Sequence, residues 1–296
     1  MTLPTFLIIG APKCGTTSVY DYLAQHPQVF MSPVKEPRFF DNEGNPDPST
    51  IRRDEAVITG IEAYRALFAK APPAVRAIGE ASPTYLRSEN AAAGIKRHIP
   101  QARLVAILRQ PVDRAYSAYV MARRDGREKA ASFEEALASE RAGTAADEYF
   151  YSARAYHECL QTYYAHFPRE QIKVLRYDDL VADAPGFMRT VFDFLGVDPD
   201  APIDTSGRRN AGAVQRSQAI AGLLNRPNPI RYAARRLLPR RLREAGRERL
   251  RHVNSAPPPP LDHQLRANLT QDIEADIASL EATSGLDLSA WRVPAA

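Results

Sequence analysis

Short apolar runs alternate with stretches of helical spacing through the first two thirds of the chain. Runs typical of buried strands lie at 6–9, 104–108 and 172–177, with a shorter one within 26–32. The stretch 77–86 is predicted to be a strand that leads into a loop. Helical spacing is found at 16–23, 61–71, 91–98, 112–124, 133–138, 153–167 and 184–195. We expect Gly196 to end the last of these helices. Strands that alternate with helices predict an α/β fold with a parallel sheet.

A glycine-bounded loop joins the first strand to the first helix. Gly10 and Gly15 enclose Lys13, and Thr16 opens the helix. Unpaired N–H groups and the helix dipole converge at such a point, which favours an anion. The nucleotide-binding P-loop has its lysine directly after the second glycine, whereas here the lysine lies inside the loop. The alternative is an ordinary strand-to-helix turn with a solvated lysine.

Composition indicates a soluble globular protein and narrows the ligand class. Hydrophobic residues make up 44% and charged residues 25% of the 296 residues. The formal net charge of +4 favours anionic ligands without implying nucleic acid. Cys14 and Cys159 form neither a disulfide framework nor a zinc spacing. Because no apolar run is long enough for a membrane span and no leader pattern is present, we expect a cytoplasmic protein without a membrane anchor.

The C-terminal third has a different character. Arginines crowd 208–251, prolines fill 257–260, and 261–280 is expected to form one amphipathic helix. The arginine-rich stretch is either a solvated surface or a flap over an anionic ligand. We expect a single domain over 1–296, with an Arg- and Pro-rich variable segment at about 207–260 and a C-terminal helix.

Polar residues follow three of the apolar runs, at 13–18, 80–85 and 109–117. Ligands bind at the carboxyl ends of the strands in open α/β sheets, so these stretches are expected at one site. Arg109 at a strand end and Ser117 in the following helix can hold one phosphate group. The alternative for Arg109 is a salt bridge at the edge of the sheet.

Four motifs occur in this order: PKCGTTS, KEPRFFD, EASPTYL and RQPVDRAYS. Together they resemble the sulfotransferases that use 3′-phosphoadenosine 5′-phosphosulfate (PAPS). The closer branch holds the heparan sulfate N- and O-sulfotransferase domains and many bacterial relatives, and the resemblance covers about residues 4–200. It implies a P-loop-like three-layer fold, with a central parallel sheet flanked by helices.

The resemblance also implies roles for matching residues. The loop would hold the 5′-phosphosulfate of PAPS, with Lys13 on the bridging oxygen, through Lys13, Cys14, Gly15, Thr16, Thr17 and Ser18. Arg109 and Ser117 would bind the 3′-phosphate, and Glu36 would be the general base. The loop that closes over PAPS in the family is not recognisable, and its expected substitutes are Arg208, Arg209, Asn210 and Gly212, with Arg216.

Elementary chemistry agrees with these roles. Sulfuryl transfer needs a cation on the leaving oxygen and a base for the acceptor proton, which Lys13 and Glu36 can supply. A sulfuryl group carries less charge than a terminal phosphoryl group, so no metal is expected. The strand 104–108 ends in Arg109, where a Walker-B strand would carry a magnesium-binding aspartate.

The acceptor is less defined by the sequence. We expect Lys35, Glu80, Ser82 and Tyr85 on the acceptor side. Ala81 replaces a lysine of the heparan-modifying branch, which puts a glycosaminoglycan acceptor in doubt. The acceptor is expected to be a hydroxyl or amine of a small molecule, carbohydrate or lipid. The alternatives are a P-loop-type kinase or nucleotide-binding protein, and an inactive module that binds a polyanion. The sequence does not indicate an oligomeric state.

Overall fold

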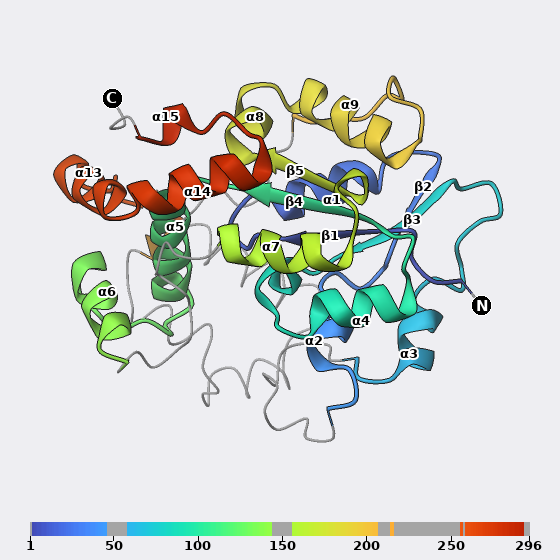
Figure 1. Ribbon diagram of the computed structural model, residues 1–296, viewed down its shortest axis with the longest axis horizontal. Helices are drawn as coiled ribbons and strands as arrows, with labels where there is room; N and C mark the ends of the chain where they lie inside the picture. Colours follow the sequence, from blue (N-terminus) through green and yellow to red (C-terminus); the bar gives the residue numbers. More distant parts are fainter. Residues whose placement is uncertain are drawn as a thin grey trace, which may run out of the picture. The chain divides into compact units, whose positions relative to one another are not determined.

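Five parallel strands form the centre of the computed structural model, which describes residues 2–45, 58–143, 156–206, 214–215, 255–256 and 258–292. Their order across the sheet is β2-β3-β1-β4-β5 (Figure 1). The strands are β1 (Phe6–Gly10), β2 (Val29–Met31), β3 (Ala77–Ala81), β4 (Arg103–Leu108) and β5 (Ile172–Arg176). The expected parallel α/β sheet is therefore confirmed, and all five strands end at the same edge.

The apolar runs form strands because both faces of the sheet are covered. Every residue of β1 is buried, and so is every residue of β4 after Arg103. In the register of β1 and β3, Phe6 lies opposite Gly79. A Cβ on Gly79 would stand 2.2 Å from the Phe6 ring, so the close approach of these side chains requires a glycine.

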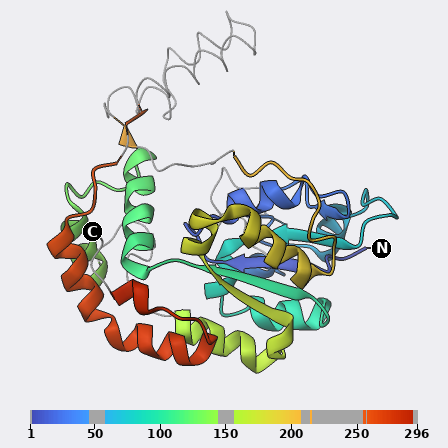
Figure 2. The same ribbon diagram turned by 90° about the horizontal axis from the view of Figure 1, so that it is seen from above.

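Helices cover the two faces of the sheet (Figures 1 and 2). One face carries α1 (Thr16–Leu23), α8 (Tyr177–Ala182) and α9 (Ala184–Leu195). The other carries α4 (Ala91–His98), α7 (Tyr156–His166) and α14 (Glu274–Ser284). These three layers confirm the P-loop-like three-layer architecture. The shorter elements of the same unit are α2 (Phe39–Asn42), α3 (Ile61–Ala66), α15 (Ser289–Arg292) and the 3-10 helices Pro83–Arg87 (η2) and Arg169–Gln171 (η3).

Local signals define several helix ends. The Asp183 side chain accepts a hydrogen bond from Gly186 N at 3.0 Å, and Gly196 ends α9 in the left-handed conformation, as predicted. Two predicted helices differ from the structure. The helix expected over 61–71 ends at Ala66, and the next residues form turns.

The helix expected over 261–280 is two helices. α13 (His263–Asp272) and α14 are separated at Ile273, whose φ of −112° and ψ of 13° interrupt the helix. The single-helix prediction was wrong because periodicity does not reveal a change of packing partner. α13 packs on α5 (Pro111–Arg124), whereas α14 packs on α7.

The structure divides into two compact units. The first contains the sheet and combines Met1–Gln110, Arg154–Arg209 and Ile273–Val293. The second combines Pro111–Ala153, Asn210–Asp272 and Pro294–Ala296, and includes α5, α6 (Phe133–Arg141) and α13. A short antiparallel pair, β6 (Val214–Gln215) and β7 (Ser255–Ala256), also belongs to it. The single domain expected over 1–296 stays a prediction.

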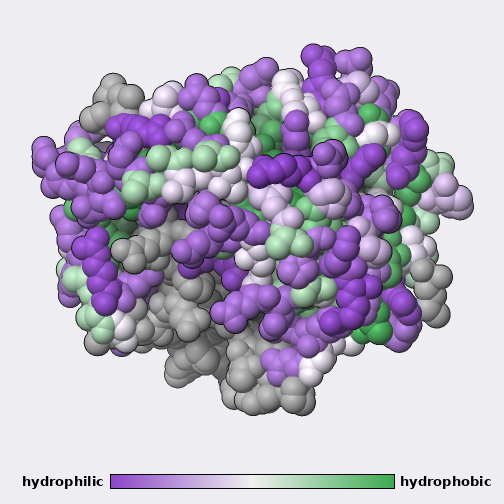
Figure 3. Space-filling view, viewed as in Figure 1, coloured by the Kyte–Doolittle hydropathy of each residue, from purple (hydrophilic) through white to green (hydrophobic). Residues whose placement is uncertain are grey.

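The surface is mainly polar. On the face viewed in Figure 3, apolar residues appear in small, separated patches among hydrophilic ones. Within the described ranges, Val181 is the one large apolar side chain that is exposed. The chain thus places its apolar runs inside, as the alternating pattern predicted.

Candidate functional site

The candidate residues of the first unit follow directly on the carboxyl ends of strands. Lys13 follows β1, Glu36 follows β2, Ser82 follows β3 and Arg109 follows β4. Because the strands are parallel, these ends lie at the same edge of the sheet. This edge is where ligands bind in open α/β sheets.

The first loop is shaped by left-handed residues. Lys13 has φ 70°, and Gly15, at the start of α1, has φ 79°. A Cβ on Gly15 would lie 2.7 Å from Leu180 Cδ2 and 2.9 Å from Tyr177 Cε2, so both the dihedral angle and the packing require glycine. Ala11 N donates to Ile107 O at 2.8 Å, which fastens the loop to β4.

The start of α1 carries no negative charge of its own. Its N-cap residue, Gly15, has no side chain that could cap the helix, and the first turn holds no acidic residue. Thr16 is buried, while Thr17 and Ser18 are half-buried. The first N–H groups of a helix have no partner within it, so this end favours negative charge.

Cys14 faces inward from the same loop. It is fully buried, its Sγ donates to Pro12 O at 3.6 Å, and it lies 3.7 Å from the Tyr156 hydroxyl. Any contribution of Cys14 to an anion would come from its backbone, because its side chain is turned into the core.

The Glu36 turn begins after β2. Glu36 has φ 57°, and Glu36 N donates to Ala81 O at 3.1 Å. Lys35 Nζ lies 2.6 Å from Glu36 Oε1. The side chains of Lys35 and Glu36 are 27% and 40% exposed, so both can be reached by a ligand. A carboxylate beside an ammonium group, within reach of solvent, is suited to accept a proton from a bound acceptor.

Arg109 and the first loop share one aromatic neighbour. The Arg109 guanidinium lies over the Tyr177 ring, 5.0 Å from its centroid, and the same ring borders Gly15. Tyr177 therefore connects the two expected anion sites. Tyr177 was not among the site residues predicted from the sequence. It comes directly after β5, and a position after a strand is the sequence feature that indicated the other residues.

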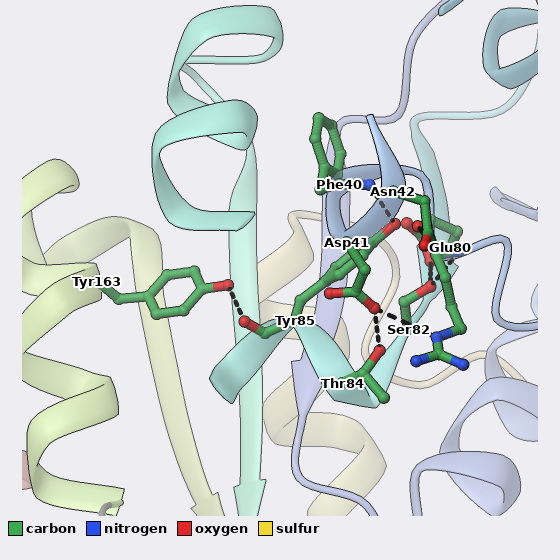
Figure 4. A network of polar contacts seen from close by, with 9 residues as sticks. Phe40, Asp41, Asn42, Glu80, Ser82, Thr84, Tyr85 and Tyr163 are labelled. Carbon is green, nitrogen blue, oxygen red and sulfur yellow. Dashed lines mark hydrogen bonds and ion pairs between the residues drawn. The ribbon is translucent and has the colours of Figure 1, made fainter. Parts of the chain in front are cut away.

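Glu80, Ser82 and Tyr85 belong to one network of polar contacts (Figure 4). Glu80 and Ser82 are 0% exposed, and so is Tyr85. Glu80 accepts hydrogen bonds from Ser82 Oγ at 2.8 Å and Tyr64 Oη at 3.2 Å. Burial raises the pKa of the Glu80 carboxyl to about 7, and the hydrogen bonds from Ser82, Tyr85 and Tyr64 oppose that rise. In this structure the three residues have no exposed surface, and their expected place on the acceptor side stays a prediction.

Two groups of expected residues do not belong to the described part of the first unit. Ser117 is half-buried on α5 and belongs to the second unit, whereas Arg109 belongs to the first. The binding of one phosphate group by Ser117 and Arg109 together therefore stays a prediction. Arg208, Arg209, Asn210, Gly212 and Arg216 lie outside the described residues.

No group of three or more His, Cys, Asp or Glu residues in the described part of the chain could hold a metal ion. Among the described helices, none has the length and apolar character needed to cross a membrane.

Comparison with known proteins identifies the family. A model described as the sulfotransferase family matches residues 4–201. The chain belongs to the sulfotransferase family. The protein is similar to the crystal structure of a sulfotransferase from Alicyclobacillus acidocaldarius, with a TM-score of 0.72 and a sequence identity of 30%. The match covers 99% of this chain and 100% of the Alicyclobacillus chain.

Two curated relatives of this sulfotransferase-family chain have names that describe the modification of carbohydrates. Mouse heparan sulfate glucosamine 3-O-sulfotransferase 3B1 is 29% identical over 197 residues, covering 66% of this chain and 46% of the relative. Mouse carbohydrate sulfotransferase 15 is 28% identical over 255 residues, covering 67% of this chain and 44% of the relative. The chain thus spans less than half the length of these relatives.

Proposed function

We propose that this protein transfers the sulfuryl group of PAPS to a hydroxyl or amine of a small-molecule, carbohydrate or lipid acceptor. The observation that supports the proposal is that Lys13, Glu36 and Arg109 come after the carboxyl ends of β1, β2 and β4 in one parallel sheet, in a chain of the sulfotransferase family. PAPS is an anionic co-substrate that supplies an activated sulfuryl group.

The donor is held at its two phosphorylated positions. The loop amides and the start of α1 bind the 5′-phosphosulfate, with Lys13 on the bridging oxygen. Arg109 binds the 3′-phosphate, since a guanidinium gives paired hydrogen bonds to phosphate. The Tyr177 ring, which touches both parts, supports this arrangement because it keeps them next to each other.

Glu36 and Lys13 share the transfer step. Glu36 takes the proton of the acceptor hydroxyl or amine while the acceptor atom forms its bond to sulfur. The bond from sulfur to the bridging oxygen breaks in line, and Lys13 neutralises the charge that develops on that oxygen. Lys35, 2.6 Å from the Glu36 carboxylate, orients it toward the acceptor. The products are the sulfated acceptor and adenosine 3′,5′-bisphosphate.

Donor binding is tested with adenosine 3′,5′-bisphosphate in the absence of magnesium. We expect this nucleotide to raise the melting temperature by several degrees and to bind about tenfold or more weakly to Lys13→Ala and Arg109→Ala, because each loses a charge-assisted contact. Lys70→Ala and Arg189→Ala, which change exposed residues, are the matched controls. If the protein binds ATP with magnesium but not adenosine 3′,5′-bisphosphate, the result favours the alternative of a P-loop-type kinase.

The base is tested by the turnover of Glu36→Gln. With ³⁵S-labelled PAPS and a metabolite extract as the acceptor source, we expect this variant to bind the bisphosphate normally and to lose turnover by about a hundredfold or more. The control is Glu62→Gln, which alters an exposed carboxylate on α3. Full turnover in Glu36→Gln would remove Glu36 from this role. Identification of the labelled product names the acceptor.

A further inference from the structure

The turn that carries Glu36 is fastened to the end of β3 at two points. Glu36 N donates to Ala81 O at 3.1 Å, and Arg38 N donates to Ser82 Oγ, also at 3.1 Å. Glu36 and Arg38 have φ values of 57° and 52°. Residues with side chains rarely adopt this left-handed conformation, so the turn needs outside contacts to keep it.

The second contact depends on the direction of one hydroxyl proton. Ser82 Oγ donates to Glu80 Oε2 at 2.8 Å. A serine hydroxyl has one proton and two lone pairs, so donation to Glu80 leaves the lone pairs free to accept from Arg38 N. The other carboxyl oxygen, Oε1, accepts from Tyr64 Oη at 3.2 Å.

Glu80 and Ser82, which form the middle of this chain of hydrogen bonds, are buried. Figure 4 shows the side chains of Glu80 and Ser82 next to each other, and neither residue has exposed surface. A carboxyl group is rarely kept in such a place unless it is needed there, and its raised pKa reflects the cost of burying its charge.

We propose that Glu80 and Ser82 are positioning residues for Glu36: Glu80 orients the Ser82 hydroxyl, Ser82 holds the Arg38 amide, and the turn thereby presents the Glu36 carboxylate at the edge of the sheet. This inference rests on the proposed role of Glu36 as the base. In this proposal Glu80 and Ser82 act by holding the Glu36 turn, whereas the sequence analysis expected them to contact the acceptor.

The first test is Ser82→Ala, assayed with ³⁵S-labelled PAPS and the metabolite extract. We expect kcat to fall about tenfold or more while KM for PAPS stays within about twofold, because Lys13 and Arg109 are untouched. Hydrogen exchange of the Arg38 amide should become about tenfold faster. Ser279→Ala, an exposed serine on α14, is the control for both measurements.

A second pair of variants applies if Ser82→Ala does not fold. Glu80→Gln keeps an oxygen that accepts from Ser82, so we expect kcat within about threefold of the wild type. Glu80→Leu removes the acceptor at similar size, and we expect the same loss of kcat as in Ser82→Ala. Rescue by glutamine separates an acceptor role from a requirement for charge.

The outcomes distinguish this inference from the proposed function. An inactive Glu36→Gln together with full kcat and an unchanged Arg38 exchange rate in Ser82→Ala overturns only the positioning role. A lower melting temperature with unchanged kcat also overturns it, since this is the result of a merely structural role. An active Glu36→Gln overturns the role of Glu36 as the base, and the positioning role with it.

Discussion

Gly15 is the residue that sets the shape of the first loop. Its φ of 79° suits glycine, and its missing side chain leaves room for Tyr177 and Leu180. Tyr177 in turn lies under Arg109. A single small residue thus determines how closely the loop approaches the second expected anion site.

We expect Gly15→Ala to be destabilising and to abolish nucleotide binding. The added methyl group has to displace Leu180 or the Tyr177 ring, beyond the roughly 1 kcal/mol cost of a left-handed alanine. Gly285→Ala is the control, because Gly285 has a similar φ of 74° with nothing within 4 Å. Urea denaturation and binding of adenosine 3′,5′-bisphosphate measure the two effects. Equal destabilisation of both variants, with binding retained, would contradict the packing argument.

At the scale of elements, an ion pair joins α13 to α5. The buried residues of α13 are Arg266 and Thr270, both polar. Arg266 Nε and Nη2 donate to Asp113 Oδ1 and Oδ2 at 2.9 and 3.0 Å. The Arg266 side chain is 10% exposed and that of Asp113 30%, so solvent screens this ion pair only in part.

A double-mutant cycle should give a measurable coupling energy between Arg266 and Asp113. We expect Arg266→Ala to destabilise the protein by about 1–3 kcal/mol and a coupling energy with Asp113→Ala of about 1–2 kcal/mol, because each single change leaves a partly buried charge. The exposed pair of Arg189 and Asp200, with side chains 63% and 75% exposed, is the control and should couple by less than about 0.5 kcal/mol. Thermal unfolding followed by circular dichroism provides the free energies. Equal coupling in the two pairs would be evidence against the docking role.

At the scale of the whole molecule, the buried Glu80 carboxyl links stability to pH. Its pKa is raised from 4.5 to about 7 in the folded protein. Between these pH values the folded state keeps a proton that the unfolded state has released. The free energy of unfolding therefore falls as the pH rises through this window and levels off above it.

Glu80→Gln should remove this part of the pH dependence. The difference in unfolding free energy between wild type and variant should change by about 3 kcal/mol from pH 4.5 to above 7, with the wild type losing stability relative to the variant. Burial also raises the pKa of Asp41, a group that is present in both proteins. Trp291, the single tryptophan, lies in the same unit as Glu80, so its fluorescence during urea denaturation reports the relevant transition. A constant difference across this range would disprove the linkage.

Local patterns were sufficient for most of the first unit. The predicted strand 104–108 became β4, the predicted helices 91–98 and 184–195 became α4 and α9, and the anion loop lies between β1 and α1. These elements were predictable because a buried strand needs a continuous apolar run, a surface helix needs an apolar face, and a helix end needs Gly196. The sequence by itself therefore determined the parallel α/β fold and the residues that follow its strands.

Only the tertiary structure decided what each of these residues faces. Glu80 and Ser82 are at the expected edge of the sheet but are fully buried, and Tyr177 lies beside both Arg109 and Gly15, which are distant in the chain. The break at Ile273 likewise follows from the different helices on which α13 and α14 pack. Spacing along a chain tells which residues share a face, but the partner that covers that face comes from distant segments, and it alone determines burial, pKa and reach.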